Sequence, residues 1–189
     1  MILALALSLL TSARAASYEI DATHSYVGFS VVHMTISNVR GEFGSVSGKV
    51  DYDDANVAAT KASASVTIAS VDTRDAKRDA HLQTADFFDA AKYPSMSFAS
   101  KAVKNPTSAG FDLVGDLTIR GVTKEVTFHV DPFSAEVKDP WGNTKRATHA
   151  TARINRQDFG VNFGAVLDNG GYVVANDVDI ELNIELKKL

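Results

Sequence analysis

The stretch SYVGFSVVH, from Ser25 to His33, carries the repeat on which the fold prediction depends. Every second residue forms one series, in the order Val27, Phe29, Val31 and His33. The residues between them form a second series, Tyr26, Gly28, Ser30 and Val32. Successive side chains of a β-strand point to opposite faces of the sheet, so a repeat of two predicts a strand with one apolar face.

The same repeat returns along the rest of the chain and predicts about eight strands. It is present at Phe43 to Tyr52, Ala64 to Ile68, Met96 to Phe98, Phe111 to Ile119, Val126 to Val130, Ala147 to Ile154 and Val178 to Leu186. Turn-forming stretches separate the strands: RGEFGS from Arg40, NPTSAG from Asn105, RGVTK from Arg120, KDPWGN from Lys138 and DNGG from Asp168. No repeat or linker divides the chain, which predicts one all-β domain, either an antiparallel sandwich or a barrel without free edges.

One stretch, RDAHLQTADFFDAAKYPSMSF from Arg78 to Phe98, interrupts the strand pattern. Residues 75–84 favour helix, with an aspartate near the start, and a further short turn must end before Pro94. A helical insertion between two strands of a barrel lies naturally over one end. Phe87 and Phe88 are then predicted to plug that end or to line its entrance, because two adjacent rings are not both stable in water.

The predicted inner faces mix large and small residues, which leaves two interiors open. Large rings are found at Phe29, Phe98 and Phe128, and small residues at Ala64, Ser100, Gly115, Ala150 and Ala152. Eight strands enclose either packed side chains or one small ligand. The pattern alone is compatible with a filled core and with a cavity.

The first residues predict a leader for export. An apolar run from Ile2 to Leu10 is followed by Ala13, Arg14 and Ala15, the small-x-small pattern of a cleavage site, so residues 1–15 are predicted to be a signal peptide and 16–189 the domain. The run is too short to span a bilayer, which needs about 20 residues. The expected location is the periplasm or the outside of the cell.

Composition and charge exclude several classes of function. The chain has 19 Lys and Arg against 23 Asp and Glu, and no basic stripe is visible, which disfavours nucleic acid as a partner. With no cysteine, disulfides and thiolate chemistry are absent. His24 and His33 are an odd number of residues apart, so on one regular strand they face opposite sides and cannot chelate a metal together. The chain lacks the nucleophile-elbow, phosphate-loop and HExxH motifs, and no catalytic residue, metal or cofactor is predicted.

Five ordered blocks of sequence resemble the YceI family of exported, lipocalin-like proteins. They are DATHSYVGFSVVHM from Asp21, VRGEFGSVSG from Val39, the stretch from Ser70 to Phe98, GDLTIRGVTKEV from Gly115 and INRQDFG from Ile154. The resemblance implies an antiparallel lipocalin-like β-barrel with a short helical insertion. It also implies a non-enzymatic role in which the apolar interior holds a polyisoprenoid lipid, such as a polyprenyl or quinone-type lipid, in the periplasm.

The candidate ligand-binding residues follow from the repeat and the resemblance together. The apolar candidates are Val27, Phe29, Val31, Phe43, Val66, Ile68, Phe87, Phe88, Phe98, Leu113, Leu117, Phe128 and Ile180. His33 is the candidate for a polar point inside, and Arg78, His81 and Arg156 are candidates for the mouth. Three of these residues have a second interpretation. His33 is then a hydrogen-bonded buried histidine, Arg78 belongs to a solvated helix face, and Arg156 ties down a loop and touches no ligand.

The predicted partner is a polyisoprenoid lipid, and transient membrane contact and a homodimer are both left open. The alternative function is a secreted interaction module with a filled core. A lipid bound in native mass spectrometry would distinguish a carrier from that module.

Overall fold

The computed structural model describes residues 15–189 with the exception of 165 and 169, so the predicted leader lies outside the described residues except for Ala15. The described residues form one antiparallel sheet of twelve strand segments. The segments are β1 Ala16–Ile20, β2 Tyr26–His33, β3 Ser37–Phe43, β4 Val46–Tyr52, β5 Lys61–Thr67, β6 Val71–Asp72, β7 Ser95–Thr107, β8 Gly110–Ile119, β9 Val122–Val130, β10 Val137–Lys138, β11 Thr144–Asn155 and β12 Val174–Lys188. The helical elements are α1 Ala76–Leu82 and the 3-10 turns η1 Val57–Ala59, η2 Ile68–Ser70 and η3 Arg156–Phe159.

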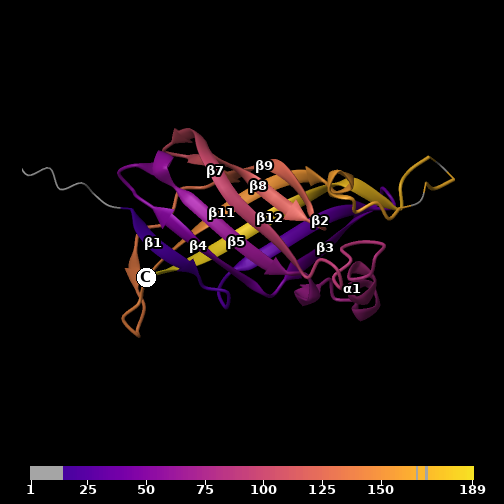
Figure 1. Cartoon of the computed structure of the whole chain (residues 1–189), viewed down its shortest axis with the longest axis horizontal. Coiled ribbons are helices and arrows are strands. Elements are labelled where there is room, and N and C mark those ends of the chain that lie inside the picture. The colour runs from indigo at the N-terminus through magenta and orange to yellow at the C-terminus, as the bar shows by residue number, and fades with distance from the viewer. Residues whose placement is uncertain (1–14, 165, 169) are drawn as a thin grey trace, which may run out of the picture.

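The twelve segments make a closed barrel of eight strands. Six of the segments combine into three long strands: β1 with β2, β3 with β4, and β5 with β6. In the first pair of long strands β1 pairs with β4 and β2 with β3, and in the second β4 pairs with β5 and β3 with β6. β7, β8, β9, β11 and β12 follow in sequence order, and β12 closes the barrel by pairing with β11 on one side and with β1 and β2 on the other. The prediction of an all-β antiparallel barrel of about eight strands is therefore confirmed (Figure 1).

Local sequence explains where the strands turn. β8 and β9 are joined by Arg120 and Gly121 alone, both with positive φ, as a two-residue hairpin turn requires. β12 shows the two-residue repeat most clearly: alternate apolar residues face the interior, and Leu186 is fully buried. β12 pairs with β11 over almost the whole length of β11, which makes this the longest ladder of the closure.

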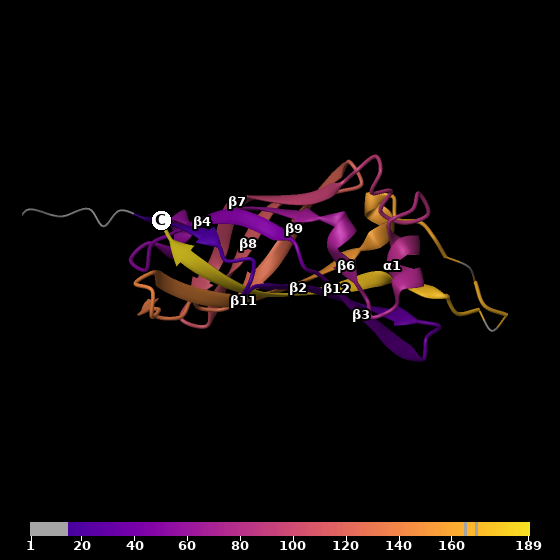
Figure 2. The same cartoon turned by 90° about the horizontal axis from the view of Figure 1, so that it is seen from below.

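The predicted helix is confirmed as α1, between β6 and β7. Asp75 precedes it and its carboxylate accepts hydrogen bonds from the backbone N–H groups of Lys77 and Arg78, which caps the helix. Residues 83–93 continue as turns up to Pro94. Figure 2 shows α1 at one end of the barrel, the same end at which the β2–β3 hairpin projects, and the C-terminus at the other. No described helix is long and apolar enough to cross a membrane.

Candidate functional site

Two apolar cavities lie one behind the other inside the barrel. The first cavity lies away from α1 and has a volume of about 180 Å³. The second lies beside α1 and has a volume of about 130 Å³. Both are lined by Met96, Ile119 and Ile180, which therefore stand at the boundary between them. We call the two cavities together the chamber. Its walls are almost purely hydrocarbon, so the chamber suits an apolar ligand longer than either cavity alone.

Most of the predicted ligand-binding residues line the chamber. The first cavity is lined by Val27, Val66, Phe98, Leu113, Leu117, Phe128 and Ile180. The second is lined by Phe29, Val31, Phe43, Phe87, Phe88, Arg156 and again Ile180. The face of β2 that the repeat indicated thus turns inward, first toward one cavity and then toward the other.

Four predicted residues do not line the chamber. Strand β5 ends at Thr67, so Ile68 leaves the alternation, turns into the 3-10 helix η2 and packs in the wall at 2% exposure. His33 is the last residue of β2 and is not among the residues that line either cavity, so its role as a polar point inside stays a prediction. The lining of the chamber ends on β2 at Val31.

Arg78 and His81, both on α1, are held outside the chamber by their own hydrogen bonds. Arg78 donates to the hydroxyl and to the carbonyl oxygen of Thr73, each at 2.7 Å, and borders a polar surface groove instead. The Nε2 of His81 lies 2.9 Å from the carboxylate of Asp86. The His81 ring also meets Phe87 edge-on, with ring centroids 5.1 Å apart. Neither residue lines the chamber, and their role as polar residues at the mouth stays a prediction.

Among the described residues that line the chamber, Arg156 is the one with a charged side chain, and it is 7% exposed. Its guanidinium donates to the carbonyl oxygens of Val161, Val174 and Ala175 at 2.7, 3.1 and 2.9 Å. Burial lowers the pKa of the guanidinium, and no carboxylate among the described residues pairs with it. The interpretation of Arg156 as a residue that ties down a loop fits this geometry, because the three carbonyls belong to the two ends of the 161–175 segment.

Phe87 and Phe88 both line the second cavity; Phe87 belongs to one packing cluster, whereas Phe88 packs against that cluster and against a second one. Phe87 is 8% exposed and packs with Leu117, Phe159 and Val161. Phe88 packs against the cluster that contains Phe43. The guanidinium of Arg120 donates to the carbonyl oxygens of Ala85 and Phe87, which fixes the turn that carries both rings.

The small residues do not all leave space. Ala64 and Ala150 line the first cavity as the mixed pattern suggested. At Gly115, however, an added Cβ would come within 2.4 Å of the Phe98 ring and 2.5 Å of the Ala99 carbonyl oxygen. Gly115 therefore leaves no free space in the interior, because Phe98 already fills it.

Sequence reasoning missed Phe133, which lines the first cavity. The alternation of β9 places Phe128 and Val130 inside, so an odd-numbered residue after them is expected on the outer face. Pro132 breaks this phase, because β9 ends at Val130 and the chain turns before Phe133. A proline directly after an alternating run was the available signal.

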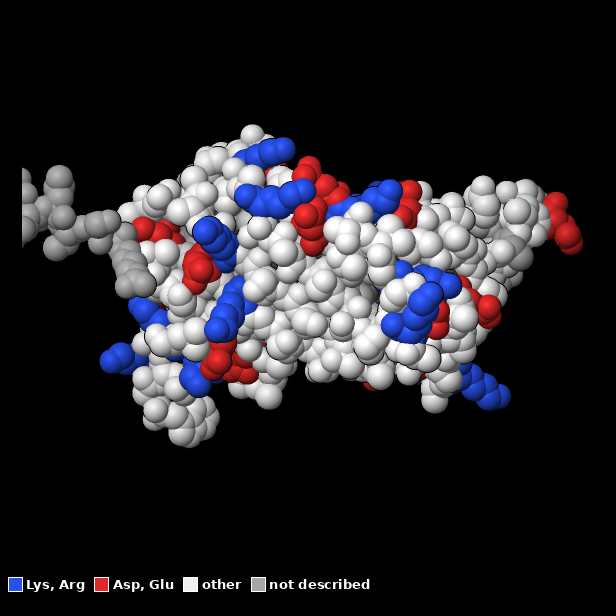
Figure 3. Space-filling view, viewed as in Figure 1, with Lys and Arg blue, Asp and Glu red and all other residues white. Residues whose placement is uncertain are grey.

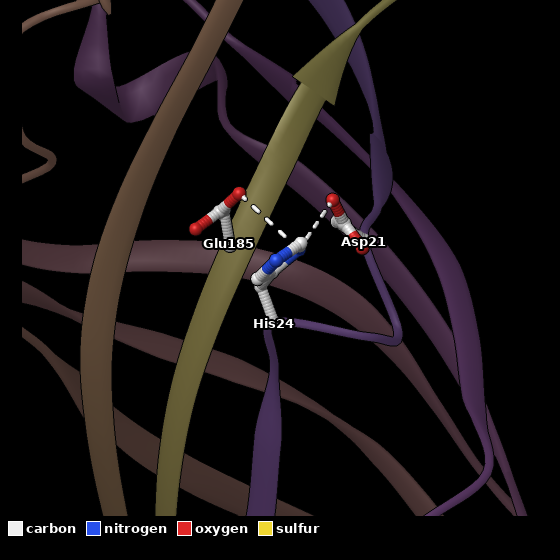
Figure 4. A group of neighbouring side chains, drawn as sticks. All are labelled: Asp21, His24 and Glu185. Carbon is white, nitrogen blue, oxygen red and sulfur yellow. Dashed lines mark hydrogen bonds and ion pairs between the residues drawn. The ribbon is translucent and has the colours of Figure 1, made fainter. Parts of the chain in front are cut away.

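A polar cluster at the surface joins Asp21, His24 and Glu185, whose oxygen and nitrogen atoms lie close enough to hold a metal ion (Figure 4). Nδ1 of His24 is 3.0 Å from Asp21 and 3.8 Å from Glu185. The ammonium of Lys145 already bridges the two carboxylates, at 2.6 and 2.7 Å. Its hydrogen bond holds the pKa of Asp21 well below the usual range, and the pKa of Lys145 is raised. The cluster is thus an ion-pair network in which one ammonium bridges two carboxylates, and it links β11 and β12 to the segment between β1 and β2.

Charges of both signs are mixed on the surface. Figure 3 shows Lys and Arg beside Asp and Glu in separate groups around a largely uncharged centre, with a basic group near α1. Several pairs are direct, such as Lys101 with Asp116 at 2.8 Å and Arg153 with Asp179 at 2.6 Å. Such interspersed pairs do not form the continuous basic stripe that nucleic-acid backbones require.

These features define a class of protein, the antiparallel up-and-down β-barrels with an apolar interior cavity. The chain belongs to the YceI family: the YceI-like domain model matches residues 18–186. A UPF0312 protein of Pseudomonas putida strain W619 is 37% identical over 187 residues, which cover 97% of this chain and 93% of that protein.

Solved structures share the fold. The YceI protein of Campylobacter jejuni superposes with a TM-score of 0.68 at 32% identity, covering 89% of this chain and 96% of that one. A polyisoprenoid binding domain from Saccharophagus degradans superposes with a TM-score of 0.63 at 16% identity, covering 93% of this chain and all of that domain (100%). At 16% identity the second likeness concerns the fold alone.

Proposed function

We propose that this protein binds a polyisoprenoid lipid in the chamber and carries or sequesters it. The ligand is a lipid of the polyprenyl or isoprenoid-quinone type. The observation that carries the proposal is the chamber itself, two apolar cavities in line along the barrel with hydrocarbon side chains on nearly every wall. Each methylene-sized group removed from water contributes about 0.8 kcal/mol, so a branched hydrocarbon chain supplies most of the affinity. The alternative of an interaction module with a filled core is less well supported, because the interior holds space.

The comparisons support the same ligand class without deciding it. A member of the fold is described as a polyisoprenoid binding domain, and this chain shares that fold. A linear isoprenoid matches a chamber that is elongated and lined by branched aliphatic and aromatic residues. We infer a binding role rather than a catalytic one, because the charged group on the chamber wall, Arg156, is already engaged by backbone carbonyls.

We propose that the protein works after export, in the periplasm or outside the cell. The proposal rests on the apolar run and cleavage pattern of residues 1–15. Intact-mass measurement of protein recovered from the periplasm or medium should give the mass of a chain that begins at Ala16. Protein that keeps Met1 and stays in the cytoplasm would contradict the proposal.

We also propose that lipid enters and leaves at the α1 end of the barrel, while that end is in brief contact with a membrane. Apolar side chains are exposed at the tips of two segments there: Ile36 at 80% in the β2–β3 hairpin, and Val166 at 67% and Tyr172 at 51% in the segment before β12. A backbone hydrogen bond from Met34 to Val173 holds the two segments together. Ile36→Asp should slow transfer of lipid to vesicles and leave lipid affinity unchanged; an unaltered transfer rate would exclude this contact.

The central experiment identifies the ligand directly. The protein is produced with its own leader, purified without detergent and analysed by native mass spectrometry, and the organic-solvent extract is analysed by liquid chromatography and mass spectrometry. We expect an isoprenoid to leave with the protein and to reload from a polyprenol mixture. A folded protein that carries no isoprenoid and takes up none in the loading step would overturn the proposed function.

A further inference from the structure

A stack of aromatic rings lies at the end of the chamber away from α1. Phe133 lies against Tyr52, with ring centroids 4.2 Å apart and planes inclined by 28°. On its other side Phe111 is almost parallel, at 6.4 Å and 7°. Tyr52 and Phe111 are 7% and 3% exposed. Phe111 and Phe133 both line the first cavity, so a ligand that enters from the α1 end reaches these rings last.

A buried arginine fixes the stack from behind. Arg146 is 3% exposed, and its guanidinium carbon stands 4.6 Å from the Tyr52 ring centroid and 5.3 Å from that of Phe133. The guanidinium pairs with both oxygens of Asp54, at 2.9 and 3.1 Å. Cation–π contacts and a bidentate ion pair together hold the buried Arg146 in one geometry, although the Asp54 side chain itself is exposed.

The backbone beside Phe133 is tied down as well. The carbonyl oxygen of Ser134 accepts a hydrogen bond from Arg146 at 2.9 Å. The backbone of Ser134 donates to the carbonyl of Ala147 at 2.8 Å, and the Ser134 hydroxyl accepts from the N–H of Ala147 at 3.0 Å. Three bonds to β11 on the residue that follows Phe133 make this ring a fixed wall, in contrast to the exposed segments at the α1 end.

The two ends of the chamber also differ in polarity, which gives a bound lipid a direction. The two rings of the stack that line the first cavity, those of Phe111 and Phe133, are purely hydrocarbon. The α1 end holds the buried cation of Arg156 and lies at the end of the barrel where the exposed side chains of Ile36 and Tyr172 project. A hydrocarbon terminus is most stable against the rings, and a polar head is most stable where water is near.

We infer that Phe133 is the stop that sets the longest isoprenoid chain the chamber accepts, with the tail of the lipid against this ring and the head at the α1 end. This inference rests on the proposed function. Along β12 the lining runs from Val174 to Leu186, which is about 40 Å at ~3.3 Å per residue. A chain longer than the chamber must leave isoprene units in water at the head end or displace the fixed ring.

The inference is tested with a mixture of linear polyprenols that differ by one isoprene unit. Each protein is loaded from the same mixture, and the bound species are counted by native mass spectrometry. Phe133→Ala should move the preferred length upward by one unit or more, with roughly tenfold enrichment of the longer chain over the wild-type optimum. Phe133→Leu keeps an apolar side chain in place and should give a smaller shift in the same direction, and it carries the test if the alanine variant fails to fold.

Phe163→Ala is the matched control, because it removes an aromatic ring at the other end of the barrel. Phe163 is 37% exposed and stacks on Phe87, so its loss is expected to alter release and to leave the preferred length unchanged. If wild-type protein binds no polyprenol, the proposed function has failed. If wild-type protein binds and the folded Phe133 variants keep the wild-type length preference, the inference about Phe133 is wrong and the function stands.

Discussion

The rings of Phe43 and Phe88 meet edge to face, with centroids 5.9 Å apart and planes inclined by 75°. Phe43 lies 5.7 Å from Phe29 in turn, so Phe88 extends a row of rings along the second cavity. Phe87, the neighbour of Phe88 in sequence, packs in another cluster and is backed from outside by His81 and Phe163. Two adjacent residues of the insertion therefore serve different parts of the same end.

The variants Phe87→Ala and Phe88→Ala are expected to separate in their effects. Phe87 is buried, and removal of a buried phenylalanine costs about 3–5 kcal/mol of stability. Phe88 is half-buried and ends the ring row beside the chamber, so its loss should cost less stability and chiefly accelerate lipid release. Thermal melts and transfer of a fluorescent polyprenyl analogue to vesicles measure the two quantities. Equal effects of both variants on melting and release would contradict this division.

The architecture could be predicted from the sequence because the signals for strands and turns come from residues that are close together in the chain. The two-residue repeat of β2 and β12 and the Arg120–Gly121 hairpin turn each depend on residues close together in the chain. The insertion was accessible for the same reason, since its Asp75 cap needs only the next three residues. These local signals agree with one another, which is the condition under which a pattern specifies a fold.

The residues of the chamber wall were harder to predict, because the lining depends on how side chains from different strands pack against one another. The ring of Phe98 occupies the room that Gly115 leaves, although their strands are separated by a turn. Phe133 enters the cavity only because Pro132 breaks the phase of β9. The placement of Arg78 is decided by hydrogen bonds to Thr73, which the strand repeat does not contain.

Ala64→Phe is expected to expel lipid by filling the first cavity. Ala64 lines that cavity on β5, and the added ring takes the volume that an isoprene unit needs. Gly115 is not a useful site for this test, because any side chain there collides with Phe98 and with backbone. The cost of overpacking is about 1–3 kcal/mol, which leaves room for a folded variant. Lipid occupancy by native mass spectrometry should fall roughly tenfold.

Ser65→Phe is the matched control for Ala64→Phe. Ser65 is the next residue of β5, is exposed and points to the outer face, so it receives the same ring without entering the chamber. Its lipid occupancy should equal that of the wild type. A folded Ala64→Phe protein with wild-type occupancy would show that lipid does not reach the first cavity.

Arg156→Met should loosen the segment that precedes β12. The substitution leaves the carbonyl oxygens of Val161, Val174 and Ala175 without their donor, and each buried carbonyl left unpaired costs about 1–3 kcal/mol. Arg153→Met is the control, since Arg153 is on the surface of β11 with only Asp179 as partner. Hydrogen exchange should increase at Val161 and Val174 in the first variant and stay unchanged in the second. Lost lipid binding without faster exchange would instead assign Arg156 to the head group.

Asp21→Asn should make the stability of the protein fall less steeply as the pH is lowered. The hydrogen bond from Lys145 holds the pKa of Asp21 below its ordinary 3.8, so the folded state binds this proton less readily than the unfolded chain. Stability from the pair is therefore fully present above the ordinary pKa and is lost as the pH falls through it toward the folded value. Lys145 does not oppose this trend, because its pKa is raised and its contribution persists below its ordinary 10.5.

Melting temperatures between pH 7 and pH 2.5 provide the measurement for Asp21→Asn. The variant should melt roughly 3 °C lower at pH 7, because Lys145 keeps only Glu185 as partner, and the difference should shrink toward zero as the wild type loses its own pair in acid. Glu42→Gln is the control, because the exposed Glu42 carboxylate has no ion pair among the described residues. Asp54 and Glu136 also have lowered pKa values, so the acid slope of the variant decreases without vanishing. An Asp21→Asn protein whose melting curve runs parallel to the wild type at every pH would show that the network with Lys145 does not stabilise the barrel.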